Sequence, residues 1–304
     1  MSAAWVARVP ASTSNLGPGF DLLGLALGLW LEVRVTEGTG RDHELVRTGT
    51  GTGELPGAEG DLVLRAFEAV RAARPFAGSF RFDVHSEIPV GRGLGSSGAA
   101  VVAGALLARV LSRAELADSE LLARAIELEG HPDNAAAALH GGLTLCARRS
   151  NGGWRVITPP LSTRIGFAVA WPASPLPTAR ARAVLPPSVP FGDAVENPRR
   201  LALLLEGLRT GERELIELGG VDRLHVSYRL PLLPGSERAF AAAREAGAWM
   251  TTLSGAGSGL LALGERGRME PVAEAMAAEL RAATGLGTGR VLDACHEPAG
   301  VRPA

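Results

Sequence analysis

The sequence predicts an α+β protein of two domains, covering residues 1–160 and 161–304. The 304 residues are 46% apolar, enough to bury a large core, and a chain of this length typically forms about two domains. Segments with the two-residue period of strands occur together with segments typical of helices. Six prolines between residues 172 and 190 predict a long loop without regular structure, so we place the domain boundary near 155–165.

The N-terminal half mixes strands with helices. Residues 29–36 and 79–85 alternate apolar and polar side chains, the pattern of half-buried strands. Residues 99–111 are apolar on nearly every face and too few to cross a bilayer, so we expect a helix buried in the core. A further helix is predicted over 119–129, and Pro132 opens another short one.

The C-terminal half alternates strands with helices, which predicts a two-layer α/β sandwich. The strand candidates are residues 165–171, 249–253, 260–263 and 289–293. The helix candidates are residues 197–209, 236–246 and 270–283.

Charge and composition favour small-molecule partners. The chain has 31 basic and 32 acidic residues and no run of like charges, so the electrostatic pattern of a nucleic-acid or membrane-surface binder is missing. It shows neither a signal-peptide pattern nor a long apolar stretch, and we expect a cytoplasmic protein. Cys146 and Cys295 are too few for a disulfide framework and too isolated for a zinc site, so we expect both to be reduced.

All 31 basic residues are arginine, because the sequence contains no lysine. This absence excludes a P-loop, a protein kinase and Schiff-base chemistry, each of which requires a lysine amine. A phosphate site in this chain must therefore use backbone N–H groups, hydroxyls, arginine and a metal ion.

The richest motif is PVGRGLGSSG, between the predicted strand 79–85 and the predicted helix 99–111. A strand, a glycine-rich turn and a helix N-terminus form an anion site, because free N–H groups and the positive end of the helix dipole converge there. Serine hydroxyls at the helix start can cap N–H groups, contact phosphate or hold Mg²⁺. We expect a nucleotide phosphate to bind Pro89, Val90, Gly91, Arg92, Gly93, Leu94, Gly95, Ser96, Ser97 and Gly98.

This motif has two other interpretations. Residues 93–98 also match GxGxxG, with Glu115 about 20 residues further on, as in dinucleotide-binding folds. That fold requires repeated βαβ units, whereas here two further helices and the Gly141-Gly142 turn follow. A tight turn with two capping serines is the plain structural alternative.

The pattern PxxxGLGSSxA resembles the phosphate loop of the GHMP kinases, the family that includes galactokinase, homoserine kinase, mevalonate kinase and phosphomevalonate kinase. That loop functions without lysine. The resemblance implies ATP and Mg²⁺ as cofactors and often a homodimer. It also implies an N-terminal ribosomal-protein-S5-domain-2-like β/α domain and a C-terminal ferredoxin-like α/β sandwich.

Three further motifs are similar to those of the family, in the expected order. Residues 8–27 (RVPASTSNLGPGFDLLGLAL) resemble its opening motif in the homoserine kinase form, and 129–134 (EGHPDN) match a motif of the same enzymes. Residues 253–263 (LSGAGSGLLAL) resemble its C-terminal glycine motif, although Ser258 and Gly259 replace Pro and Thr. This resemblance implies that Gly255 and Gly257 cover the nucleotide phosphates; a simple glycine hairpin is the alternative.

The EGHPDN motif supplies a metal ligand near the phosphate loop. Mg²⁺ takes carboxylate and hydroxyl oxygens and bridges two phosphates, so we assign Glu129 with the Ser97 or Ser96 hydroxyl as its ligands. Glu127 is the alternative acid, and a solvated acid at the helix end is the structural interpretation of Glu129. His131, beside a proline at a helix start, is expected to have a structural role.

The resemblance implies L-homoserine as the substrate, phosphorylated on its side-chain hydroxyl. Asp21 can pair the ammonium, and two arginines match those that homoserine kinases direct at the carboxylate. The expected substrate contacts are Asn15, Asp21, Asn134, Thr178, Arg182 and Arg229. Mevalonate and sugars lack the ammonium that Asp21 can pair. The alternative enzyme is a GHMP kinase for mevalonate, shikimate or a sugar. The non-enzyme alternative is a sensor of a nucleotide or an amino acid.

Two positions bear on mechanism and on nucleotide binding. An aspartate base serves several GHMP kinases, but the matching residue is Asn134, an amide that takes no proton. We therefore expect catalysis by positioning and electrostatics, with Asn134, Asn15 and Ser97 as catalytic groups and Asp133 as the remaining candidate base. Asp61 stands where the family commonly has an asparagine near the adenine, and we expect it in the nucleotide site.

Overall fold

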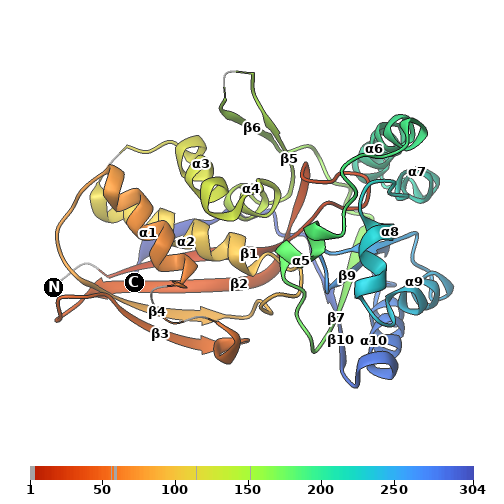
Figure 1. Cartoon of the computed structure of the whole chain (residues 1–304). Coiled ribbons are helices and arrows are strands. Elements are labelled where there is room, and N and C mark those ends of the chain that lie inside the picture. Colours follow the sequence, from red (N-terminus) through yellow and green to blue (C-terminus); the bar gives the residue numbers. More distant parts are fainter. Residues whose placement is uncertain (1–3, 56, 58–59, 114, 151) are drawn as a thin grey trace.

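The computed structural model describes residues 4–55, 57, 60–113, 115–150 and 152–304. Two sheets organise these residues, and helices pack against each (Figure 1). The arrangement is the α+β architecture that the sequence predicted.

The first sheet has seven strands, and its main path runs β11-β1-β2-β4-β3. Strand β2 also pairs with β5, and β5 with β6. The pairs are antiparallel except β3 with β4. The strands are β1 (Trp5–Ser14), β2 (Leu23–Glu37), β3 (Glu44–Gly49), β4 (Phe80–Ser86), β5 (Leu143–Arg148), β6 (Trp154–Ile157) and β11 (Gly300–Pro303).

Four helices cover one face of this sheet: α1 (Leu62–Ala73), α2 (Ser96–Ser112), α3 (Asp118–Glu129) and α4 (Asp133–His140) (Figure 1). Helix α2 is central, packing against α1, α3, α4 and β1, and its apolar residues are buried on most faces. The core helix predicted from residue 99 therefore exists but begins at Ser96. The predicted strand 29–36 is the second part of β2; the preceding residues are apolar and mostly buried, so they show no alternation.

The second sheet runs β10-β7-β9-β8, all antiparallel, with α9 and α10 packed on it (Figure 1). Its elements are β7 (Ile165–Pro172), α9 (Ser236–Glu245), β8 (Met250–Leu253), β9 (Leu260–Glu265), α10 (Glu270–Thr284) and β10 (Gly287–Leu292). Each matches a strand or helix predicted in the C-terminal half to within two residues. Helices α6 (Phe191–Thr210) and α7 (Arg213–Gly219) pack on each other beside it.

The proline-rich segment is more regular than predicted. It contains α5 (Thr178–Ala183), because Pro177 precedes the first helical residue and the next prolines come after the last, so none interrupts its turns. Helix α6 begins directly after Pro190, six residues before the start predicted at residue 197. It continues through Pro198 without a break. The short helix α8 (Val226–Arg229) was not predicted either.

The end of the chain returns to the first sheet, where β11 pairs antiparallel with β1. A division of the chain near residue 160 stays a prediction. Cys146 and Cys295 are both buried and free, as expected. Among the residues that the structure describes, no helix has the length and apolar character needed to cross a membrane.

Candidate functional site

A cavity of about 450 Å³ is lined by residues from both halves of the chain. It brings together most of the positions that the sequence singled out. The predicted residues that line it are Asn15, Asp21, Asp61, Val90, Gly91, Gly93, Leu94, Gly95, Ser96, Ser97, Asn134, Thr178, Arg182, Arg229, Gly255 and Gly257. Pro89, Arg92, Gly98 and Glu129 are not among its lining residues.

The glycine-rich turn, residues 89–98, lies against the hairpin between β8 and β9. Gly93 has a φ of 68°, and a Cβ there would clash with the Ser254 carbonyl oxygen, so both the conformation and the close approach require glycine. The Ser254 hydroxyl donates to the Gly93 carbonyl at 2.6 Å. The two glycine motifs, 161 residues apart, are therefore joined at the cavity.

Helix α2 presents its N-terminus to the cavity. Gly95, at the N-cap, has a φ of 69°, and no side chain caps the helix. Ser96 and Ser97 form its first turn and line the cavity, and the first turn contains no acidic residue. Backbone N–H groups and the positive end of the helix dipole thus favour an anion at this point.

Arg92 interacts with the scaffold and not with the cavity. Its buried guanidinium donates to the Pro172 carbonyl at 3.2 Å and also to the carbonyls of Val90 and Ala173. It forms an ion pair with Glu54 at 2.8 Å. Arg92 therefore ties the glycine-rich turn to the end of β7.

Asp61 lines the cavity, but local contacts use its carboxylate. One oxygen, Oδ1, accepts from the backbone N–H groups of Val63 at 2.8 Å and Leu64 at 3.1 Å, which caps α1. The other oxygen forms an ion pair with Arg47. An aspartate is thus accommodated at this position because a guanidinium balances its charge.

Glu129 is the last residue of α3, and its carboxyl lies within reach of Ser97 in the first turn of α2. Its Oε2 atom is buried and has no hydrogen-bond partner among the described residues. Burial raises the pKa of this carboxyl, against the opposing effects of the His131 charge and a hydrogen bond from Ser97. A buried carboxylate oxygen without a partner, next to a serine hydroxyl, fits a divalent cation that takes oxygen ligands.

No group of three or more acidic, histidine or cysteine side chains that could hold a metal occurs among the described residues. A cation at Glu129 would therefore take its other ligands from Ser97, phosphate oxygens and water, the coordination typical of Mg²⁺ with a nucleotide.

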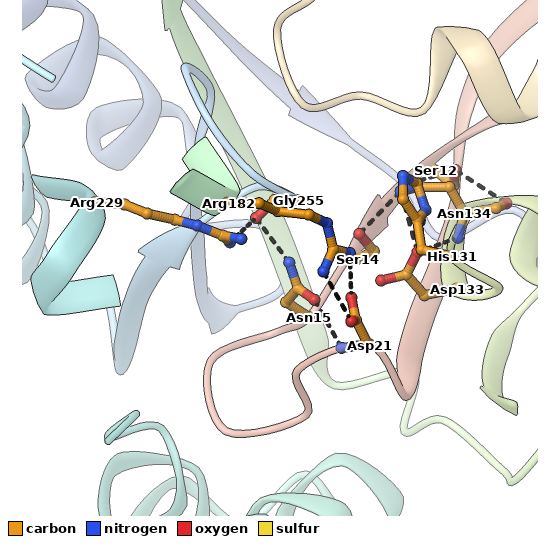
Figure 2. Close-up of polar contacts among 10 residues, drawn as sticks. All are labelled: Ser12, Ser14, Asn15, Asp21, His131, Asp133, Asn134, Arg182, Arg229 and Gly255. Carbon is orange, nitrogen blue, oxygen red and sulfur yellow. Dashed lines mark hydrogen bonds and ion pairs between the residues drawn. The ribbon is translucent and has the colours of Figure 1, made fainter. Parts of the chain in front are cut away.

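His131, Asp133 and Asn134 form a polar network that reaches Ser12 and Ser14 of β1 (Figure 2). The Asn134 side chain accepts from the Ser12 hydroxyl and donates to the Ser14 hydroxyl, each at 3.0 Å, so both amide atoms are engaged. Asp133 is 2% exposed, and its Oδ1 lies 3.2 Å from His131 Nδ1. Burial opposes a charged His131, but the hydrogen bond and charge of Asp133 raise its pKa overall.

The loop after β1, residues 15–21, carries two of the expected substrate contacts. Asn15 and Asp21 have φ angles of 69° and 53°, left-handed values that aspartate and asparagine adopt more readily than most residues. The Asn15 side chain accepts from the Asp21 N–H at 3.0 Å and donates to the Gly255 carbonyl at 2.8 Å. Asn15 therefore holds this loop against the C-terminal glycine motif.

Asp21 and Arg182, expected to bind opposite ends of the substrate, bind each other (Figure 2). The bidentate pair has N–O distances of 2.6 and 3.0 Å, and each side chain is about one third exposed. Thr178 begins the helix that carries Arg182 and lies at the exposed rim of the cavity.

Arg229 is only 1% exposed. It donates to the Ala181 carbonyl at 3.1 Å and lies 3.0 Å from His225 Nδ1, and it has no ion-pair partner among the described residues. Burial, and after it the charge of Arg182, lowers its pKa to about 10, so the guanidinium remains cationic at neutral pH. A buried cation facing a cavity without an anionic partner is suited to an anionic ligand.

Comparison with known proteins identifies the fold family. The family model for the GHMP kinases N terminal domain matches residues 61–142, and the model for the GHMP kinases C terminal matches residues 204–282. The chain is 43% identical to a homoserine kinase of Parasynechococcus marenigrum over 89% of this chain and 87% of that protein. The chain belongs to the GHMP kinase family.

Other GHMP kinase relatives agree. A homoserine kinase of Moorella thermoacetica is 44% identical over 89% of this chain and 90% of its own. The crystal structure of a homoserine kinase from Cytophaga hutchinsonii superposes with a TM-score of 0.88 at 25% identity, covering 99% of this chain and 98% of that one. The GHMP kinase fold expected from the motifs is therefore confirmed, and the dinucleotide-binding alternative is wrong.

Sequence reasoning missed several polar groups that shape this GHMP kinase cavity. Ser12 and Ser14 orient Asn134, and Arg47 balances Asp61. His225 contacts Arg229, and a histidine four residues before an arginine expected to bind substrate was the available signal. Ser12, Ser14 and Arg47 gave no comparable signal in the sequence, because isolated serines and arginines are common in any chain.

Proposed function

We propose that this chain catalyses ATP-dependent phosphorylation of the side-chain hydroxyl of L-homoserine to O-phospho-L-homoserine, a reaction of threonine biosynthesis. The observation that carries the proposal is the grouping of one carboxylate and two guanidinium groups, Asp21, Arg182 and Arg229, beside a lysine-free phosphate loop in one cavity. The similarity to homoserine kinases supports the same assignment.

The nucleotide end of the cavity suits a triphosphate. The start of α2 and the backbone of the glycine-rich turn supply donors for phosphate oxygens, while Gly255 and Gly257 cover them from the hairpin. Glu129 and the Ser97 hydroxyl are proposed to hold Mg²⁺. When bound there, the ion neutralises charge on the phosphate oxygens during phosphoryl transfer.

The other end of the cavity suits a zwitterion. Homoserine carries a carboxylate and an ammonium, the chemical complements of Arg182 and Asp21, so its binding exchanges one internal ion pair for two. Arg229 then provides the second guanidinium for the carboxylate, since it forms no ion pair with any residue that the structure describes. An uncharged sugar leaves Asp21 and Arg182 paired with each other and offers no anionic partner to Arg229.

The hydroxyl proton requires no aspartate base in this proposal. Asn134 uses both amide atoms in hydrogen bonds to Ser12 and Ser14, which fixes the direction of its side chain. Catalysis then rests on orientation and on electrostatic stabilisation of the transferring phosphoryl group. Asp133 is the one remaining candidate base; an Asp133→Asn variant that binds substrate normally but turns nothing over would contradict the base-free mechanism.

A phosphorylation assay over a substrate panel tests the function. The purified chain with ATP and Mg²⁺ should release ADP with L-homoserine, and release far less with mevalonate, shikimate or a sugar. Faster turnover of one of those substrates would assign a different GHMP kinase activity. ADP release with none of them would support a sensor. A homodimer remains a prediction, which sedimentation equilibrium can test.

A further inference from the structure

Arg229 is held by neutral acceptors alone. Its guanidinium contacts the Ala181 carbonyl, the His225 imidazole and, at 3.5 Å, the Gly255 carbonyl. These groups are neutral, so among the described residues the guanidinium forms no ion pair, and the carboxylates of Asp21, Asp222 and Asp133 act on it only from a distance. An ion pair with a ligand in the cavity therefore remains open to it. The side chain at position 225 therefore decides two things: how the Arg229 guanidinium is oriented, and whether an anionic neighbour pairs with its charge.

The two hydrogen bonds of His225 define its protonation state. Nε2 lies 3.0 Å from the Gly17 carbonyl oxygen, which only accepts, so Nε2 must carry a hydrogen. Nδ1 lies 3.0 Å from Arg229 Nη1, which only donates, so Nδ1 must offer its lone pair. Both contacts are satisfied at once only by the neutral imidazole with its hydrogen on Nε2.

The surroundings hold the imidazole in this orientation. Asp222 accepts from the His225 backbone N–H at 2.7 Å, and the Phe20 ring stacks on the imidazole at 5.0 Å between centroids. The guanidinium groups of Arg182 and Arg229 lie 5.4 and 5.3 Å from the centre of the same Phe20 ring. His225 itself is fully buried.

We propose that His225 is a positioning residue for substrate binding: as a neutral imidazole anchored on Gly17, it orients the Arg229 guanidinium toward the substrate carboxylate without cancelling its charge. The anchor lies within the loop 15–21, so His225 also couples Arg229 to the segment that carries Asn15 and Asp21. This inference rests on the proposed homoserine kinase function. Burial lowers the pKa of His225, which favours the neutral form.

Two isosteric substitutions separate the two contacts. Asparagine places its amide at the position of Nδ1 and can still accept from Arg229, whereas glutamine reaches the position of Nε2 and keeps only the Gly17 contact. His225→Gln should raise the KM for L-homoserine about tenfold with little change in kcat or in the KM for ATP. His225→Asn should raise the KM for L-homoserine distinctly less. Ser227→Ala is the control, because Ser227 is exposed and lies in the same short helical segment.

The pH profile provides a second measurement. The charged groups that face His225 are Asp222, Arg229 and Asp21, and only protonation of the imidazole removes the acceptor for Arg229. In the wild type, the homoserine KM should therefore rise as pH falls below about 6, and this rise should be smaller in His225→Asn.

The outcomes are distinguishable. If the wild type phosphorylates no homoserine, the proposed function and this inference both fail. If it does, but the glutamine and asparagine variants raise the KM equally, or kcat and the KM for ATP change in parallel, the positioning role alone is refuted. Circular dichroism of each variant separates these results from unfolding.

Discussion

Replacement of Arg229 should weaken homoserine binding far more than replacement of Arg182, although both guanidinium groups face the same cavity. Arg229 is 1% exposed and has no internal ion pair to lose among the described residues, so its contact with a carboxylate forms in a weakly screened environment. Removing one partner of such a buried charge pair costs about 3 kcal/mol. That loss corresponds to roughly a 150-fold weaker affinity for Arg229→Gln.

Arg182 differs from Arg229 in two ways: its side chain is more exposed, and without substrate it forms an ion pair with Asp21. Its side chain is 36% exposed, and the bond to Asp21 is given up when a substrate carboxylate takes its place. Arg182→Gln also frees Asp21 for the substrate ammonium. The net cost is about 1 kcal/mol, or roughly fivefold in affinity.

The assay is calorimetric titration of L-homoserine into each variant in the presence of a non-hydrolysable ATP analogue and Mg²⁺. Arg180→Gln is the matched control, because Arg180 lies in the same short helix and is exposed; its affinity should stay within about twofold of the wild type. An equal or larger loss for Arg182→Gln would refute the reasoning that burial and internal pairing determine the contribution of each arginine.

Three further predictions concern the scaffold and the metal site. Glu129→Gln should lower kcat by about 100-fold, because it removes the proposed Mg²⁺ ligand. It should not lower the melting temperature, because the carboxylate has a buried oxygen without a partner among the described residues; the exposed Glu127→Gln should change neither kcat nor the melting temperature. Arg92→Ala should reduce the free energy of unfolding in urea by about 3 kcal/mol, since it leaves buried carbonyls unpaired; a loss below about 1 kcal/mol would contradict this. Burial lowers the pKa of both His225 and His140. For these two groups the unfolded chain binds more protons near about pH 6.5, whereas the raised pKa of His131 acts in the opposite direction. The unfolding free energy of the wild type should therefore fall relative to that of His225→Gln as pH drops below about 6.5, measured on both proteins across the same pH range.

Much of the fold followed from local patterns. Alternating residues, a fully apolar stretch and glycine or proline at boundaries predicted the strands of the second sheet and helices α2, α3, α9 and α10, because each pattern reports how a segment meets the core. Helix α5 was missed, because its prolines resemble those of a loop until their positions outside the helical turns are known.

The sequence predicted many of the residues that line the cavity, but not which of them contact one another. The glycine-rich turn was identifiable because left-handed backbone and a helix start depend on neighbouring residues. Arg92 belongs to the same motif, yet its side chain points to Pro172 and Ala173, about 80 residues away in the chain. No local pattern contains that information.

By itself the sequence determined the chemical groups available: a lysine-free glycine-rich turn, an acid expected to bind a metal, and an acid with two arginines expected to bind a charged substrate. Only the tertiary structure decided how they are paired. It joined Asp21 to Arg182 and buried Arg229 against His225, because charge pairing and burial depend on which distant segments pack together. The energetic difference between two similar arginines is therefore a property of the folded chain.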